Sequence, residues 1–324
     1  MHTEGEPLRI LTEGIPDLPG TSILEKRRAA SEQFDWVRKT LMAEPRGHRD
    51  MYGCILTPPV DPESDLGVIF LHNEGYSTMC GHGIIGLATA VLETGMLPCR
   101  EPETSIRIDT PAGLVTARAR VKAQRVQSVA FENVPSFVIG LDQNVKVPGI
   151  GNVRFDLAFG GAFYVFVDAS SLGLTLKPEA AADLVAKGIA IKIAVMEHFT
   201  IRHPFESDLG FLYGTIFTGP PRTPDADSRN VCIFADGQVD RSPTGTGVSA
   251  RMAIGWAREQ IGLDRPVFIE SIIGSRFSGR VKRTLRFGPY DAVIPEVEGR
   301  AFFTGRHEFW LDPDDPLAHG FLVV

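Results

Sequence analysis

Two short segments, far apart in the chain, carry nearly the same pattern. The first is Cys-Gly-His-Gly at residues 80–83, the second is Thr-Gly-Thr-Gly at 244–247, and alanines follow both at helical spacing. A G-x-G sequence at a helix start lets a ligand approach exposed backbone N–H groups closely. The repeat therefore predicts two similar half-domains, each of which presents one helix N-terminus.

Strand-like segments surround both motifs, and their order supports an α+β fold. They lie at 52–57, 66–72, 105–109, 114–121, 126–134, 155–169, 212–219, 230–235 and from 267 onward. The sequence therefore predicts two pseudo-symmetric half-domains, each with a mixed β-sheet around a central helix. The repeat places the boundary near residues 120–130. We expect residues 1–125 plus about 295–324 in the N-terminal half-domain and 126–294 in the C-terminal one.

Several local elements are also expected. Residues 22–42 have the apolar periodicity of one amphipathic helix, and Pro178 is well placed to open a helix that runs from Lys177 to Lys187. The two motif helices are expected to end near Leu92 and Ile261. The segment 220–229, rich in Pro and Asp, is predicted to be an exposed loop.

Composition excludes several classes of protein. The net charge is −7, which argues against nucleic acid or an anionic membrane as the main partner. The N-terminal MHTEGEPLRI lacks the basic flank and apolar core of a signal peptide, so a cytoplasmic location is expected. The four cysteines are scattered, and His198 and His203 are separated by a segment, FTIR, that is predicted to be a strand. No metal site is therefore expected.

Cys80 lies directly before the first pair of glycines. Unpaired N–H groups and the positive end of the helix dipole favour a thiolate there. The pKa of a cysteine, about 8.5 in model peptides, is expected to fall toward neutrality at such a position, which suits a general base. The alternative is a buried structural cysteine. The matching copy at 244 favours the functional interpretation, because two such helix starts can jointly bind a carboxylate.

Thr244 occupies the corresponding place with a different capability. A hydroxyl is too weak an acid to carry a proton near neutral pH as a thiolate does. Two facing thiols can remove a proton from one side of a carbon and return one to the other, whereas a thiol facing a threonine performs only the first half well. The carbanion must then be resolved another way, for example by loss of a leaving group. The alternative role of Thr244 is that of an N-cap, and both roles are compatible.

Four neighbours are candidates for substrate binding. Asp240 is an acceptor for a substrate N–H, a turn-forming residue or a partner for Arg241. His82 either binds a carboxylate or hydroxyl or has a structural role. Tyr52 and Phe234 either flank a ring-shaped substrate or belong to the core.

At these residues the chain resembles the proline racemase family, which also includes hydroxyproline epimerases and trans-3-hydroxy-L-proline dehydratases. The matching segments are HTEGEP (2–7), EPRGHRDMYG (44–53), MCGHG (79–83), FGGAFY (159–164), DRSPTGTG (240–247) and DPDDPLAHGF (312–321). Racemases and epimerases of this family carry cysteine at both nucleophile positions. The pair Cys80 and Thr244, with the stretch HNEGYSTMCGH (72–82), is similar to the dehydratase branch.

The resemblance implies a diaminopimelate epimerase-like fold with a substrate cleft between the halves, no cofactor, and often a homodimer. It further implies that Gly81, His82, Gly245 and Thr246 hold the substrate carboxylate, that Asp240 binds the ring nitrogen, and that Tyr52 and Phe234 flank the ring. Family members usually have several residues before HTEGEP, including a strand that ends in Asp. This chain begins Met1-His2, so a shortened first strand is expected.

The resulting hypothesis is a cofactor-independent hydro-lyase. The Cys80 thiolate removes the α-proton of trans-3-hydroxy-L-proline, and the 3-hydroxyl leaves as water. The product is the 2-pyrroline enamine, which tautomerises to 1-pyrroline-2-carboxylate. Thr244, His82 and an ordered water are all candidates for protonating the hydroxyl. A proline racemase or 4-hydroxyproline epimerase is the nearest alternative, and a non-catalytic amino-acid binding protein is another. No metal, pyridoxal phosphate, nucleotide, nucleic acid or membrane is implied.

Overall fold

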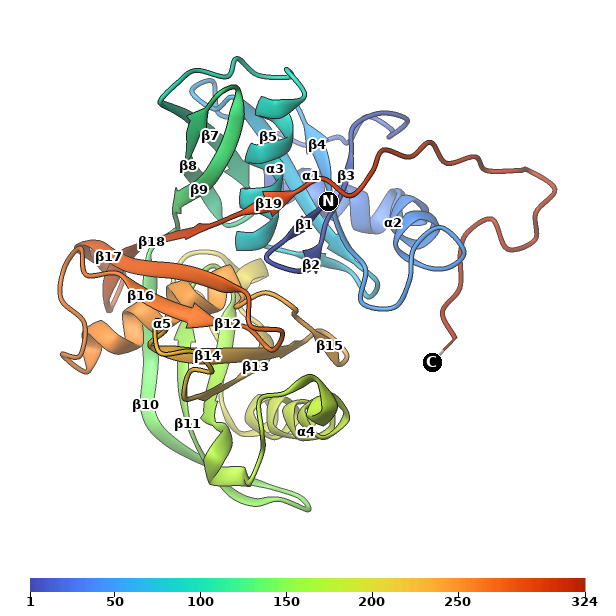
Figure 1. Ribbon diagram of the computed structural model, residues 1–324. Helices are drawn as coiled ribbons and strands as arrows, with labels where there is room; N and C mark the ends of the chain where they lie inside the picture. Colours follow the sequence, from blue (N-terminus) through green and yellow to red (C-terminus); the bar gives the residue numbers. More distant parts are fainter. Residues whose placement is uncertain (324) are drawn as a thin grey trace. The chain divides into compact units, whose positions relative to one another are not determined.

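Contacts between residues divide the chain into two units, and the computed structural model describes residues 1–323 (Figure 1). Unit 1 comprises Met1–Val129 and the C-terminal segment from Arg300, and unit 2 comprises Ala130–Gly299. The borders expected from the repeat lie a few residues from these. The C-terminal segment is tied to unit 1 by Arg46, whose guanidinium donates to the carbonyl oxygens of Trp310 and Ala318.

A mixed sheet of order β3-β4-β5-β7-β8-β9 runs through unit 1. Its strands are β3 (Arg9–Leu11), β4 (Tyr52–Thr57), β5 (Leu66–His72), β7 (Glu103–Thr110), β8 (Gly113–Lys122) and β9 (Arg125–Glu132), with β6 (Tyr76–Ser77) paired to β5. A small second sheet contains β1 (His2–Thr3), β2 (Glu6–Pro7) and β19 (Ala301–Phe302). Helix α3 (Gly81–Glu93) is buried from Gly81 to Leu92 and packs against β8, β1 and β19.

Unit 2, whose residues the structure describes throughout, is a closed barrel of eight strands. The strands are β10 (Ser136–Val147), β11 (Gly151–Phe159), β12 (Phe163–Asp168), β13 (Leu212–Gly219), β14 (Ser228–Phe234), β16 (Val267–Glu270), β17 (Arg276–Phe287) and β18 (Tyr290–Gly299). β18 pairs with β10 and closes the ring. Helix α5 (Gly245–Ala257) packs against β10, β11, β17 and β18, while α4 (Ala181–His198) packs against β13 and β14 (Figure 1).

The same succession of elements occurs in both units. In unit 1, β3 and β4 are parallel, β4 and β5 are antiparallel, a hairpin to β6 leads into α3, and β5 is parallel to β7. In unit 2, β12 and β13 are parallel, β13 and β14 are antiparallel, a hairpin to β15 (Gln238–Val239) leads into α5, and β14 is parallel to β16. The predicted fold of two pseudo-symmetric halves, each with a mixed sheet and a central helix, is confirmed.

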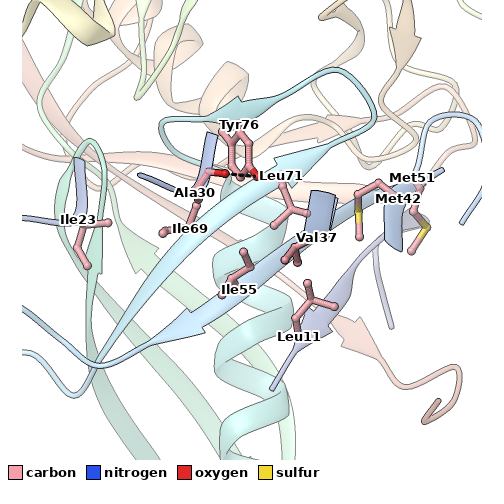
Figure 2. Packing of buried hydrophobic residues seen from close by; sticks show 10 residues of the cluster. All are labelled: Leu11, Ile23, Ala30, Val37, Met42, Met51, Ile55, Ile69, Leu71 and Tyr76. Carbon is pink, nitrogen blue, oxygen red and sulfur yellow. Dashed lines mark hydrogen bonds between the residues drawn. The ribbon is translucent and has the colours of Figure 1, made fainter. Parts of the chain in front are cut away.

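The core of unit 1 explains why its first helices form where they do (Figure 2). Apolar side chains of β4 and β5 meet apolar positions of α1 (Ile23–Gln33) and α2 (Asp35–Met42). Figure 2 shows Ile55, Ile69 and Leu71 around Val37, and the Tyr76 hydroxyl donates to the carbonyl oxygen of Ala30 at 3.2 Å. Complete burial of a Leu or Ile side chain contributes about 1.5–3 kcal/mol, so this cluster fixes the helices on the sheet.

The prediction of one helix over residues 22–42 is wrong, because the chain turns at Phe34 between α1 and α2. The cause is a tertiary contact that periodicity does not reveal. The Arg38 guanidinium binds Asp35 through two nitrogens, at 2.7 and 2.8 Å, and also donates to the carbonyl oxygens of His72 and Asn73. These bonds hold α2 at the end of β5.

The helix expected over 177–187 begins and ends later than predicted. A 3-10 turn covers Pro178–Ala180, and α4 continues through Gly188 to His198. Gly188 does not end the helix because it faces β14, where a Cβ would lie 2.8 Å from Ile233 Cβ. The Thr215 hydroxyl also donates to the carbonyl oxygen of Gly188 at 2.9 Å. Close packing thus overrides the low helix propensity of glycine.

Three further local predictions are wrong. Residues 199–202 form no strand in the described structure, and directly after them His203 Nδ1 accepts the N–H of Glu206 at 3.0 Å. Helix α5 ends at Ala257 rather than near Ile261, because the chain folds back and Gln260 N–H bonds to Gly255 O at 2.8 Å. The predicted loop 220–229 ends two residues early, because Ser228 and Arg229 belong to β14.

Candidate active site

Cys80 is the N-cap of α3, as the first motif predicts. Its backbone is extended, with φ of −145° and ψ of 108°, and its carbonyl oxygen accepts the first helical bond from Ile84. Its sulfur accepts the Gly83 N–H at 3.2 Å. An N–H that donates to sulfur at a helix N-terminus stabilises the thiolate, which is the form that accepts a proton.

Another thiol in the same unit lies in a contrasting environment. Cys54 is completely buried in β4, and this burial raises its pKa to about 12. A thiol with such a pKa stays protonated near neutral pH and cannot act as a base. The helix N-terminus is thus what distinguishes Cys80 from Cys54.

His82 lies beside the Cys80 sulfur in the first turn of α3. Its Nδ1 is 3.2 Å and its Nε2 is 3.7 Å from Sγ, and the side chain is buried. The His82 carbonyl oxygen accepts the hydroxyl of Thr3 at 2.8 Å, which ties the HTEGEP segment to the helix start. The ring is therefore held where it can exchange a proton with the sulfur.

Tyr52 stands against His82 at the start of β4. The two ring centroids are 4.7 Å apart in an edge-on arrangement, and His72 stacks on the Tyr52 ring at 5.8 Å. The Tyr52 hydroxyl forms a hydrogen bond with the Ser77 hydroxyl. The structure thus brings Tyr52, Cys80, Gly81 and His82 together in unit 1.

Thr244 precedes α5 in unit 2, but its side chain does not cap the helix. Its φ of 66° and ψ of 96° lie in a region that a β-branched residue rarely adopts, and such strain is typical of functional sites. Its hydroxyl instead donates to Asp240 Oδ2 at 2.7 Å. The simple N-cap role considered for Thr244 is therefore not what the side chain does.

Asp240 uses both carboxylate oxygens within this turn. Oδ1 accepts the Ser242 N–H at 2.7 Å, which is the turn role considered above, and Oδ2 accepts the Thr244 hydroxyl. A carboxylate oxygen has lone pairs for more than one donor. Asp240, buried at 4% exposure, thus retains capacity to accept a further N–H.

The remaining predicted residues of unit 2 surround the start of α5. Gly245 is its first residue, and the Thr246 hydroxyl bonds to the Tyr164 hydroxyl at 2.7 Å. Burial raises the pKa of Tyr164 well above its ordinary value, so it remains a neutral partner. Phe234, at the end of β14, is buried and stacks on Tyr213 at 5.4 Å.

Asn230 and Arg251 hold the Thr244 turn, and neither was predicted from the sequence. Asn230 Nδ2 donates to the Pro243 carbonyl oxygen at 3.2 Å, while its Oδ1 accepts from Arg251 at 3.0 Å. Thr244 N–H donates to Ser242 Oγ at 3.1 Å, so both ends of the Pro243–Thr244 peptide are fixed. Burial lowers the pKa of Arg251 to about 10, which still leaves it charged near neutral pH. A polar residue at the start of the predicted strand 230–235, which is otherwise apolar, was the available signal.

Asn230→Asp is expected to lower turnover about tenfold and to lower the melting temperature slightly. The carboxylate keeps the contact with Arg251 but cannot donate to the Pro243 carbonyl, and loss of one buried hydrogen bond costs about 1–1.5 kcal/mol. The rate should be measured beside Ser228→Ala, which removes another acceptor of Arg251 at 2.6 Å without touching Pro243. Equal losses in both variants would contradict the role given to Asn230.

Within residues 1–323 there is no group of three or more His, Cys, Asp or Glu side chains arranged to hold a metal ion. Over the same residues, no helix is both long and apolar enough to cross a membrane.

Comparison with known proteins extends the resemblance over the whole chain. The family model for proline racemase matches residues 1–322. A protein from Colwellia psychrerythraea named trans-3-hydroxy-L-proline dehydratase is 49% identical over 322 residues, which cover 99% of this chain and 91% of that protein. A human protein of the same name is 46% identical over 329 residues, covering 100% of this chain and 93% of that protein.

A solved structure matches the whole chain as well. The hydroxyproline epimerase from Agrobacterium vitis, solved with bound trans-4-hydroxy-L-proline, superposes with a TM-score of 0.94 at 34% identity, covering 99% of this chain and 94% of that one. Together with the family match, these similarities assign the sequence. The chain belongs to the proline racemase family.

Proposed function

We propose that this protein is a trans-3-hydroxy-L-proline dehydratase, a hydro-lyase that yields the 2-pyrroline enamine and then 1-pyrroline-2-carboxylate. One observation carries the proposal: the first motif has a thiol at its helix start, whereas the second has the hydroxyl of Thr244, bonded to Asp240. The relatives that bear the dehydratase name support it.

Cys80 is proposed as the base that removes the α-proton. Its sulfur lies at the start of α3, where the N–H of Gly83 stabilises negative charge. Gly81 and His82 begin the same turn, and Gly245 and Thr246 begin α5, so each helix start offers backbone N–H groups and the positive end of a helix dipole to a carboxylate. Charge that develops toward the carboxylate during proton removal is stabilised by such donors.

Asp240 is proposed to accept the N–H of the substrate amine. The carboxylate is buried and has lone pairs beyond those used by Ser242 and Thr244. A buried carboxylate that binds a charged amine forms a strong, charge-assisted hydrogen bond. Tyr52 and Phe234 are proposed to contact the ring, and the protein is proposed to be a cytoplasmic homodimer that needs no cofactor.

The function is tested with a panel of proline and hydroxyproline isomers. Pyrroline formation, detected with o-aminobenzaldehyde, is expected with trans-3-hydroxy-L-proline and not with the 4-hydroxy isomers. If trans-3-hydroxy-L-proline were inert while trans-4-hydroxy-L-proline inverted, the proposal would fail. Sedimentation analysis of the purified protein tests the dimer.

An epimerase or racemase remains the second candidate, because of the similarity to the solved hydroxyproline epimerase. Incubation with L-proline in deuterated water distinguishes the two. Deuterium at the α-carbon with inversion of configuration would support the epimerase, while exchange without inversion supports the dehydratase.

Thr244→Cys is expected to introduce a measurable epimerase activity, on the order of a few per cent of the dehydratase rate. The new thiol is able to return a proton to carbon, which the hydroxyl of Thr244 cannot do near neutral pH. Chiral chromatography of trans-4-hydroxy-L-proline after incubation measures the inversion. Thr244→Ser, which keeps a hydroxyl, is the matched control and should show none.

A further inference from the structure

In the proposed substrate, the two groups that are lost, the α-hydrogen and the 3-hydroxyl, lie on the same face of the ring. In trans-3-hydroxy-L-proline the hydroxyl lies opposite the carboxylate. The α-hydrogen also lies opposite the carboxylate, so the hydrogen and the hydroxyl occupy the same face. Loss of water is therefore a syn elimination, in which the base and the acid approach from a common side.

A hydroxide ion is a poor leaving group, so the oxygen needs a proton as the bond to carbon breaks. A positioned acid contributes about 10²–10⁴-fold to such a step. An acid at the second motif is not required by this geometry, because the leaving oxygen lies on the side of the base. The acid is best sought beside Cys80.

His82 is the ionisable group that the structure places against the base. Both ring nitrogens lie within hydrogen-bonding distance of Sγ, at 3.2 and 3.7 Å, and the ring is held by the edge contact with Tyr52. The nearby Tyr52 hydroxyl is bonded to Ser77, and His72 Nδ1 accepts the N–H of Glu74 at 3.3 Å. The imidazole is also the side chain whose ordinary pKa suits proton transfer near neutrality.

We infer that His82 is the general acid that protonates the departing 3-hydroxyl, so that Cys80 and His82 act as one acid–base pair on a single face of the substrate. This inference rests on the proposed function. It gives His82 a role in the elimination itself, in addition to the binding role that the family resemblance implies.

The step balances in atoms and charge. The Cys80 thiolate takes the α-proton, and the electrons of the C2–H bond form the C2=C3 double bond. The C3–O bond breaks with its electron pair on oxygen, and protonated His82 gives that oxygen its N–H proton to form water. Cys80 is then a thiol and His82 is neutral. Transfer of the proton from Sγ to Nδ1, across the 3.2 Å contact, restores the starting pair.

The experiment compares two leaving groups in the wild-type protein and in His82→Asn. Asparagine places a polar amide near Sγ, but its N–H groups are not acidic and cannot protonate the leaving oxygen. Chloride leaves without protonation, so elimination from trans-3-chloro-L-proline needs the Cys80 base but no acid on the leaving group. We expect His82→Asn to lower dehydration of trans-3-hydroxy-L-proline about 10²–10⁴-fold. Chloride elimination should fall by less than about tenfold.

His72→Asn is the matched control, because His72 contacts Tyr52 from β5 and is given no catalytic role. Any loss in that variant should be equal for the two substrates. Circular dichroism checks folding, and His82→Gln replaces His82→Asn if the latter does not fold.

Different outcomes test the role of His82 and the proposed function separately. Equal losses on both substrates in the His82 variants, or a loss of less than tenfold on the hydroxyl substrate, would overturn the role of His82 alone. A wild-type protein that eliminates chloride but not water would overturn the proposed function, and the inference with it.

Discussion

Replacing Cys80 by serine is expected to lower kcat for dehydration about 10³–10⁴-fold and to raise the free energy of unfolding slightly. The loss follows because a hydroxyl is too weak an acid to supply an anionic base near neutral pH. The gain follows from the position of Cys80 at the N-cap of α3, where its sulfur accepts the Gly83 N–H. Serine is a preferred N-cap residue, so we expect a gain of about 0.5 kcal/mol.

Steady-state kinetics and urea denaturation measure the two changes in one preparation. Cys99→Ser is the matched control, since Cys99 is partly exposed and its pKa is raised by desolvation and by Glu93 and Glu101. That variant should change neither quantity. A Cys80→Ser variant with more than a tenth of wild-type activity would place the base elsewhere. A lower kcat together with a higher free energy of unfolding would show that Cys80 is retained for catalysis although serine is more stabilising at this position.

Much of the fold is predictable because the repeated motif and the strand patterns are local. The strands at 52–57, 66–72 and 212–219 occur as β4, β5 and β13, with the predicted bounds. Errors occur where a distant contact decides the local structure. The α1–α2 break depends on carbonyl groups at the end of β5, and the length of α4 depends on the fit of Gly188 against Ile233.

The residues of the candidate site likewise fall into those that local motifs predict and those that depend on distant contacts. Residues adjacent to a motif, such as Cys80 and Thr244, are visible from spacing and from the known behaviour of helix N-termini. The bond between Thr244 and Asp240 is also local, but its use in place of a helix cap depends on the positive φ of Thr244. Asn230 escapes prediction because its partners, Pro243 and Arg251, are separated from it in sequence, and the residues that follow it in the predicted strand 230–235 are apolar.

Gly160, in the FGGAFY segment, is required to be a glycine by a contact that the sequence does not reveal. It follows β11, and its carbonyl oxygen accepts from Asn133 Nδ2 at 2.7 Å. A Cβ at this position would lie 2.5 Å from the backbone nitrogen of Ala250 and closer still to the carbonyl oxygen of Thr246. Both atoms belong to the first turns of α5, so the barrel wall touches the backbone of the central helix here.

Gly160→Ala is therefore expected to lower the free energy of unfolding by about 3 kcal/mol, near the upper end for an added methyl group, because the clashing atoms are backbone and cannot rotate away. Urea denaturation measures the loss. Gly262→Ala is the matched control, since no atom lies within 4 Å of the Cβ it would add, and its effect should stay within about 0.5 kcal/mol. A loss below 1 kcal/mol in Gly160→Ala would mean that α5 moves aside readily. The expected loss of stability, if turnover also falls, would show that contact between Gly160 and the backbone of α5 positions Gly245 and Thr246 as well as stabilising the barrel.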